Sequence, residues 1–141
     1  MTKVDFYLLG ADADSRERIA CRLAEKAWRL GNRVYLLAPD KPAALELDEL
    51  LWTFSQDSFV PHALCANDGD ADVHPVLIGH AEPPAALHDV LISLAPEVPV
   101  WSSRFARIAE LVGAAEDDKA RGRERFRYYR ERGYPLETHN L

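Results

Sequence analysis

The fold is decided near the N-terminus by Val4-Asp5-Phe6-Tyr7-Leu8-Leu9-Gly10, a short run rich in β-forming residues that predicts a buried strand. Asp14 or Ser15 then caps a helix that runs to Leu30 and ends at Gly31. Helical spacing of apolar residues supports this helix, at Ile19, Ala20, Leu23, Ala24 and Ala27. The N-terminal segment is therefore a strand followed by an amphipathic helix.

This alternation continues along the chain. Apolar runs predict further strands at residues 33–38, 76–79, 90–94 and 107–113. The last of these also suits a helix, but Gly113 closes it and a capped helix begins soon afterwards. Two further helices are predicted, one capped by Asp40 and one over residues 116–132. Residues 55–72 are polar and interrupted, with an apolar insert at residues 58–64. A loop at about 65–75 is the only one long enough to be mobile.

Strands that read as continuous apolar runs are typical of parallel sheets covered by helices. We therefore expect an α/β fold with a mostly parallel sheet and helices on both faces, in a Rossmann-like three-layer arrangement. The length of 141 residues fits a single domain over residues 1–141. Composition is that of a globular protein, and no apolar run is long enough to span a bilayer. The N-terminus lacks a signal peptide and the two cysteines suggest no disulfide framework, so we expect a cytosolic protein.

A fold of this kind raises the question of a nucleotide, but the turn at residues 9–15 argues against one. It has neither the GxGxxG spacing nor a GxxxxGK[ST] loop, and Asp12 and Asp14 would repel a phosphate. The chain also has no nucleophile elbow and no zinc-type spacing, and its scattered histidines fit surface positions or strand ends (His74, His80 and His88). We therefore expect no catalytic residues, no metal site and no cofactor.

The most basic segment, residues 119–132, contains seven Lys/Arg and two Asp/Glu, a net charge of +5. Because the whole chain carries −6, the remainder carries −11, and the cations are concentrated on one predicted helix. Four cations fall within about a quadrant of the helical wheel, namely Lys119, Arg123, Arg127 and Arg130. A neighbouring stripe of the helix, which we expect to face the sheet, contains Ala115, Gly122 and Tyr129. Phe126 lies between this stripe and the four cations. The glycine would allow the helix backbone to approach the sheet closely.

An aromatic ring bordered by guanidinium groups suits a short peptide that ends in an aromatic side chain and a carboxylate. The alternative is a solvated basic helix with Phe126 simply in the core.

A second candidate surface surrounds the helix after Asp40, whose inner series is Leu47, Leu50, Leu51 and Phe54. Leu45 and Trp52 are seven residues apart on nearly the opposite side, and Phe59-Val60-Pro61 follows. Together they predict an exposed apolar patch, a common mark of protein interfaces. The alternative is that residues 55–64 fold back and bury Trp52.

Seven blocks of sequence, in order and along nearly the whole chain, carry a family resemblance: residues 5–9, 24–34, 47–52, 58–62, 89–94, 110–113 and 123–134. The chain resembles the chi subunit family of bacterial DNA polymerase III holoenzyme. The resemblance implies a non-catalytic accessory of the clamp loader, similar in fold to nucleotide-binding α/β proteins. It further implies that one face binds the psi subunit and another binds the acidic C-terminal tail of single-stranded DNA-binding protein, which ends in Asp-Asp, an aliphatic residue, Pro and Phe.

The resemblance implies that tail binding belongs to Lys119, Arg123, Phe126 and Arg127, to which the helical wheel adds Arg130. It assigns psi or partner binding to Trp52, Phe59 and Pro61, and Leu45 and Val60 complete that patch. A repair helicase of the XPD type is a further implied partner of the patch. Phe126 stands where a Tyr is also found, which removes a hydroxyl. Because psi is poorly conserved, a different partner for the patch stays open.

Two other functions compete with the adaptor. Arginines interleaved with aromatic residues also suit single-stranded nucleic acid, but the net charge and the single basic element argue for little direct nucleic-acid binding. A degenerate nucleotide-binding enzyme is disfavoured by the missing phosphate loop. We expect no membrane partner, and a location in the bacterial cytoplasm with the replisome on the nucleoid.

Overall fold

The computed structural model describes residues 2–56, 59–65 and 74–141. Most of the loop expected at about 65–75 lies outside these residues. In the described ranges, no helix combines the length and the apolar character needed to cross a membrane.

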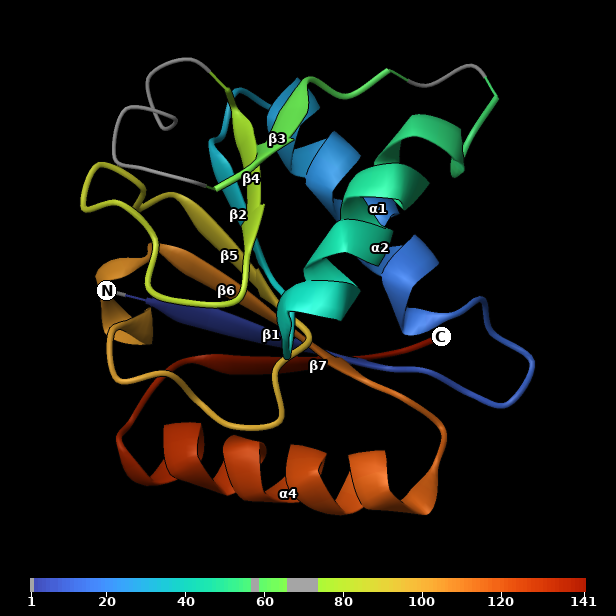
Figure 1. Ribbon diagram of the computed structural model, residues 1–141. Coiled ribbons are helices and arrows are strands. Elements are labelled where there is room, and N and C mark those ends of the chain that lie inside the picture. The colour runs from blue at the N-terminus through green and yellow to red at the C-terminus, as the bar shows by residue number, and fades with distance from the viewer. Residues whose placement is uncertain (1, 57–58, 66–73) are drawn as a thin grey trace.

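The described strands form one all-parallel sheet in the order β3-β4-β2-β5-β6-β1-β7 (Figure 1). Their bounds are β1 (Lys3–Leu8), β2 (Val34–Leu37), β3 (His62–Leu64), β4 (Val76–Gly79), β5 (Val90–Ser93), β6 (Arg107–Val112) and β7 (Leu136–Asn140). This confirms the predicted α/β class and the assignment of residues 107–113 to a strand.

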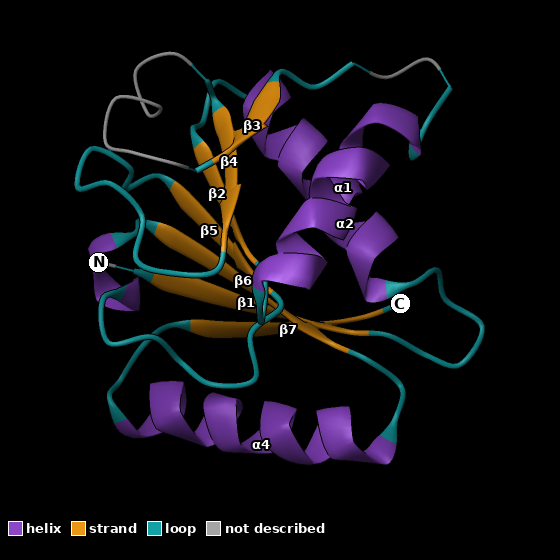
Figure 2. Cartoon of the chain, viewed as in Figure 1, coloured by secondary structure: helices purple, strands orange, loops and turns teal. Residues whose placement is uncertain are grey.

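Helices α1 (Arg16–Arg29) and α2 (Lys41–Thr53) cover one side of the sheet, and α4 (Glu116–Glu131) covers the other (Figure 2). A short 3-10 helix, η1 (Ser102–Arg104), precedes β6. The Ser15 hydroxyl accepts a hydrogen bond from the Arg18 N–H, and the Asp40 carboxylate accepts one from the Ala43 N–H. Both predicted caps are therefore confirmed, and Gly31 follows α1 with φ of 90°.

Alternation along the strands divides the core between the two faces of the sheet. Leu36 and Ile92 belong to the cluster beneath α1 and α2, whereas Leu37 and Leu91 belong to the cluster that includes Tyr129 of α4. Because both faces of the central strands are buried, these strands are apolar at nearly every position, Ser93 being the polar exception. The three-layer prediction is confirmed.

Two strands were not predicted. β3 is only three residues long and lies at the end of the apolar insert at residues 58–64, which was not assigned to a strand. β7 has mostly polar, exposed side chains and lies at the edge of the sheet, beside β1. Neither strand forms the apolar run from which buried strands are recognised.

The inner stripe of α4 was predicted only in part. Gly122 and Tyr129 are buried as expected, but Ala115 is exposed and Arg125 is buried. A Cβ atom at position 122 would lie 2.8 Å from both Cγ atoms of Val112. The predicted close approach at Gly122 is therefore confirmed.

Candidate functional site

A cavity of about 300 Å³ lies between α4 and the carboxyl ends of the strands beneath it. Its lining comes from three strands, the segments after β1 and β6, and α4: Phe6, Leu8, Leu9, Val112, Gly113, Lys119, Gly122, Arg123, Phe126 and Thr138. The sheet side of this lining is mostly apolar, and the helix side supplies two cations. The structure thus brings together three residues predicted for peptide binding, Lys119, Arg123 and Phe126.

Contacts on two sides hold the Phe126 ring. Its edge-to-face contact with Phe6 of β1 has a centroid separation of 5.2 Å. The guanidinium carbon of Arg130 lies 6.0 Å from the centroid of the Phe126 ring. Phe126 is half-buried and forms part of the cavity wall, so it is neither a fully buried core residue nor a free surface side chain.

A second hollow of about 220 Å³ adjoins the cavity and is lined by Arg123, Phe126, Arg127 and Arg130. Arg123 and Phe126 line both spaces. All five residues predicted for peptide binding therefore border one or both of these two neighbouring spaces. We name the cavity, the hollow and their lining residues together the α4 groove.

The cations of the α4 groove have few partners within the protein. Lys119 Nζ lies 3.9 Å from Glu116 Oε1, an exposed pair one helical turn apart. In the part of the chain that the structure describes, Arg123 and Arg127 form no ion pair. Guanidinium groups at the border of an apolar hollow can bind a carboxylate while the hollow takes an apolar side chain.

Sequence reasoning missed the strand side of the groove. Phe6 and Leu8 alternate with Asp5 and Tyr7 on β1, so a period of two was the available signal that both face α4. Thr138 comes from β7, a strand whose sequence contains no apolar run from which it could be predicted.

The second predicted surface is also present. Its three large apolar side chains are exposed, Leu45 by 46%, Trp52 by 54% and Phe59 by 61%. The Trp52 and Phe59 rings have centroids 5.5 Å apart. We name Leu45, Trp52 and Phe59 the α2 patch. The alternative in which residues 55–64 bury Trp52 is wrong.

Val60 does not belong to this surface, and its predicted place there is wrong. Its side chain is 1% exposed and packs in the core beneath α1 and α2. Consecutive side chains of an extended segment point to opposite sides, so an outward Phe59 sends Val60 inward. Pro61 is half-buried.

The His62 ring packs against Trp52 of the α2 patch, and this role was not predicted. Its ring centroid lies 4.5 Å from that of Trp52. Its Nδ1 lies 2.6 Å from the carbonyl oxygen of Val60, and its Nε2 lies 3.0 Å from that of Asp48. These contacts join the start of β3 to α2 and fix the His62 ring beside the indole of Trp52.

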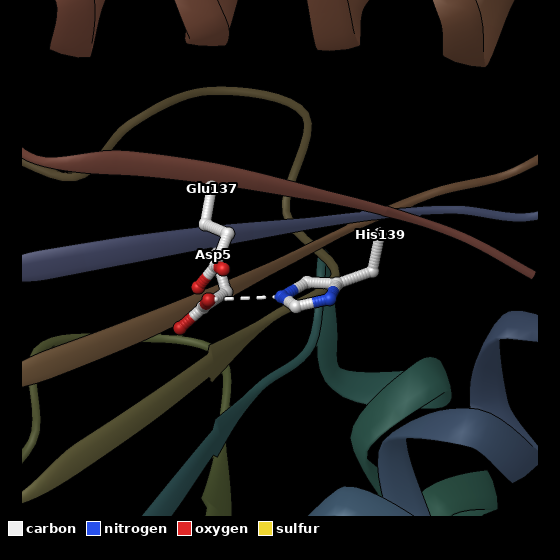
Figure 3. A group of neighbouring side chains, drawn as sticks. All are labelled: Asp5, Glu137 and His139. Atoms are coloured by element: carbon white, nitrogen blue, oxygen red, sulfur yellow. Dashed lines mark hydrogen bonds and ion pairs between the residues drawn. The ribbon is translucent and has the colours of Figure 1, made fainter.

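Asp5, Glu137 and His139 bring three potential metal-ligand atoms within 4.8 Å of one another (Figure 3). Cations of the chain already occupy this cluster. Lys3 Nζ lies 2.9 Å from Glu137 Oε2, and Arg107 donates a 2.9 Å hydrogen bond to Asp5. Burial raises the pKa of Asp5, but hydrogen bonds from His139 and Arg107 outweigh it and hold that pKa below its usual value. The cluster is therefore an ion-pair network in which the carboxylates of Asp5 and Glu137 are already paired with cationic side chains of the chain.

Comparison with known proteins gives a consistent match. The chain matches the profile of the family described as DNA polymerase III chi subunit, HolC, over residues 1–137. It is 46% identical over 142 residues to the DNA polymerase III subunit chi of Pseudomonas aeruginosa, covering 100% of this chain and 98% of that protein. The subunit of the same name from Escherichia coli strain K12 is 33% identical over 144 residues, covering 98% and 97% respectively.

Among solved structures, the crystal structure of T4 UvsW is similar with a TM-score of 0.68 and 8% sequence identity. The match covers 99% of this chain and 41% of that chain. At this identity the likeness concerns the fold alone.

Proposed function

The chain belongs to the chi subunit family of DNA polymerase III, a component of DNA replication, and we propose that it is a non-catalytic adaptor of the holoenzyme. In this proposal the α4 groove binds the acidic C-terminal tail of single-stranded DNA-binding protein. The α2 patch binds psi and so joins the chain to the clamp loader. The chain acts as one domain in the bacterial cytoplasm, at the replisome.

The observation that carries tail binding is the double role of Arg123 and Phe126, which line both the apolar cavity and the outer basic hollow. A ligand with an apolar end and an adjacent anion would use both spaces at once. The terminal Phe of the tail would enter the cavity beside Phe126. Its α-carboxylate would meet Arg123, and the upstream aspartates would meet Lys119 and Arg127 at longer range.

The α2 patch supports the second half of the proposal. Three large apolar side chains are exposed, and two of them, Trp52 and Phe59, have ring centroids 5.5 Å apart. A patch of this kind fits the apolar core of a protein interface. A repair helicase of the XPD type is a second proposed occupant of the same patch, and a chain bound to it could not bind psi there simultaneously.

The turn after β1 is poorly suited to binding a nucleotide. Asp14 already pairs with Arg18, at 3.7 Å, and with Arg22. A triphosphate at the start of α1 would therefore meet carboxylates and no phosphate loop. We propose that the chain has no catalytic activity of its own and binds nucleic acid weakly at most.

The test is direct binding of four ligands to the whole chain by calorimetry: the tail peptide, the peptide without its terminal Phe, a single-stranded oligonucleotide and ATP. We expect only the intact peptide to bind measurably, because the aspartates alone give a weak and unspecific attraction. Equal binding of the two peptides would contradict the cavity as the site of the terminal Phe. Tighter binding of the oligonucleotide than of the peptide would favour a nucleic-acid-binding module instead.

A further inference from the structure

The helix that carries the α4 groove has an unusually polar inner side. Its buried residues are a glycine, an arginine and a tyrosine, Gly122, Arg125 and Tyr129. A helix packed by interlocking apolar side chains is fixed by their shapes. α4 contributes to this packing through the Tyr129 ring and the half-buried Phe126 and Tyr128, and directional polar contacts add to what fixes its position.

Those contacts converge on one carboxylate of the strand beneath. Arg125 Nε donates a 2.9 Å hydrogen bond to Glu110 Oε1, and the Tyr129 hydroxyl donates one of 2.9 Å to Glu110 Oε2. Arg125 NH1 donates a further bond of 3.0 Å to the carbonyl oxygen of Pro96. Glu110 is fully buried and Arg125 is 5% exposed, so water competes little for these bonds.

The geometry fixes α4 in two directions. The two donors are four residues apart, about one helical turn, and each uses a different oxygen of Glu110. A rotation of α4 would break the arginine contact, and a slide of one turn, about 5.4 Å, would break both. Gly122 lies on the same stripe, where a Cβ atom would come within 2.8 Å of Val112 Cγ1 and Cγ2, so the absence of a side chain allows α4 its close approach to β6.

We propose that Glu110, Arg125 and Tyr129 are positioning residues that hold α4 in the single register in which the α4 groove is open. They do not touch the ligand. Lys119, Arg123 and Phe126 are interleaved with the buried stripe along the same helix, so a change of register would move all three away from Phe6 and Leu8. This inference rests on the proposed tail-binding function.

Buried ion pairs are weak contributors to stability, because desolvation offsets their attraction, and apolar replacements of the whole set are often neutral or stabilising. An apolar replacement of the whole set can therefore distinguish a role in positioning α4 from a role in stabilising the fold. A triple variant, Glu110→Leu with Arg125→Met and Tyr129→Phe, removes the polar set together and leaves no buried charge without its partner.

The experiment compares the triple variant with the wild-type chain in three measurements: urea unfolding, tail-peptide affinity, and hydrogen exchange of the α4 amides. We expect stability close to that of the wild type, affinity at least fivefold lower and faster exchange in α4. A matched control, Ile78→Val beneath α1 and α2, should leave affinity and α4 exchange unchanged. A stable triple variant with wild-type affinity and exchange would overturn the inference.

Tyr129→Phe alone covers the case in which the triple variant does not fold. It removes one hydroxyl and keeps the ring, and we expect faster α4 exchange with weaker peptide binding. Unchanged exchange and affinity in this variant would also overturn the inference. If the wild-type chain itself does not bind the peptide, the proposed function fails, whereas the exchange measurements still decide whether the three residues fix α4.

Discussion

Phe6 and Phe126 meet edge to face with ring centroids 5.2 Å apart, although they are far apart in the sequence. Phe6 belongs to β1 and Phe126 to α4, and both line the larger cavity. The position of the aromatic wall therefore depends on the packing of α4 against the first strand. Changes that shift α4 should alter ligand binding even when they leave every basic residue in place.

Arg123→Ala should weaken binding of the tail peptide by about tenfold or more, because a charge-assisted hydrogen bond contributes about 1.5–3 kcal/mol. Lys119→Ala should cost only about 0.2–1 kcal/mol, since Lys119 is exposed. Fluorescence anisotropy at low and high salt checks both values, and the Lys119 effect should shrink as salt screens it. Equal losses for the two variants would mean that the helix acts only as a basic surface.

Gly122→Ala should both destabilise the chain and weaken tail binding. Its new methyl group would lie 2.8 Å from both Cγ atoms of Val112. Overpacking costs about 1–3 kcal/mol, which exceeds the gain of about 1 kcal/mol in helix propensity. Adding Val112→Ala makes room for the methyl and should restore part of the peptide affinity. Chemical denaturation and calorimetry measure the two effects, and an unchanged affinity in Gly122→Ala would contradict the prediction.

Trp52→Ala and Val60→Ala should have opposite consequences. Trp52 is 54% exposed, so its truncation should leave the fold largely intact but weaken psi binding by more than tenfold, as for an interface anchor worth about 2–4 kcal/mol. Val60 is 1% exposed, so its truncation should lower the free energy of unfolding by about 2 kcal/mol. Thermal unfolding of both variants beside a psi-binding assay checks this. A large loss of stability in Trp52→Ala would show that the indole serves the core.

Glu110 should make the chain more stable as the pH falls from neutral. Burial raises the pKa of Glu110 from 4.5 to about 6, against the opposing effects of Arg125 and Tyr129. The folded state therefore binds a proton before the unfolded state does, so this contribution is fully present below about pH 4.5 and is lost as the pH rises through about 6. The difference in unfolding free energy between the wild type and Glu110→Gln isolates it. That difference should move in favour of the wild type between pH 7 and about 4.5, and a flat difference would contradict the raised pKa.

The sequence was sufficient for the layers of the fold because the central strands are buried on both faces and read as unbroken apolar runs. It was insufficient for β7, whose Glu137, Thr138 and Asn140 are exposed at the edge of the sheet. Only pairing with β1 makes this segment a strand. Long-range pairing of that kind leaves no periodic signal in a polar segment.

The candidate site was predictable on the helix side, since the wheel grouped Lys119, Arg123 and Phe126 correctly. Arg125 was missed because an arginine in a basic helix is normally exposed to solvent. The available signal was its partner, since Glu110 interrupts the apolar run of residues 108–112 and a buried carboxylate requires a donor. Val60 was wrongly assigned to the patch because it is apolar and follows Phe59 directly, whereas neighbouring side chains of an extended segment point to opposite sides.

The position of β1 in the sheet also bears on how the chain is made. Both strands that pair with β1 come from the last third of the sequence, with Lys3 beside Arg107 and Val4 beside Leu136. During synthesis β1 can therefore pair only after residues 107–112 and 136–140 have left the ribosome, and such distant pairings form slowly. A chain that ended before residue 107 would leave β1 without either of its partner strands. Phe6 and Thr138 both line the larger cavity, so the α4 groove can form only after residue 138 has been synthesised.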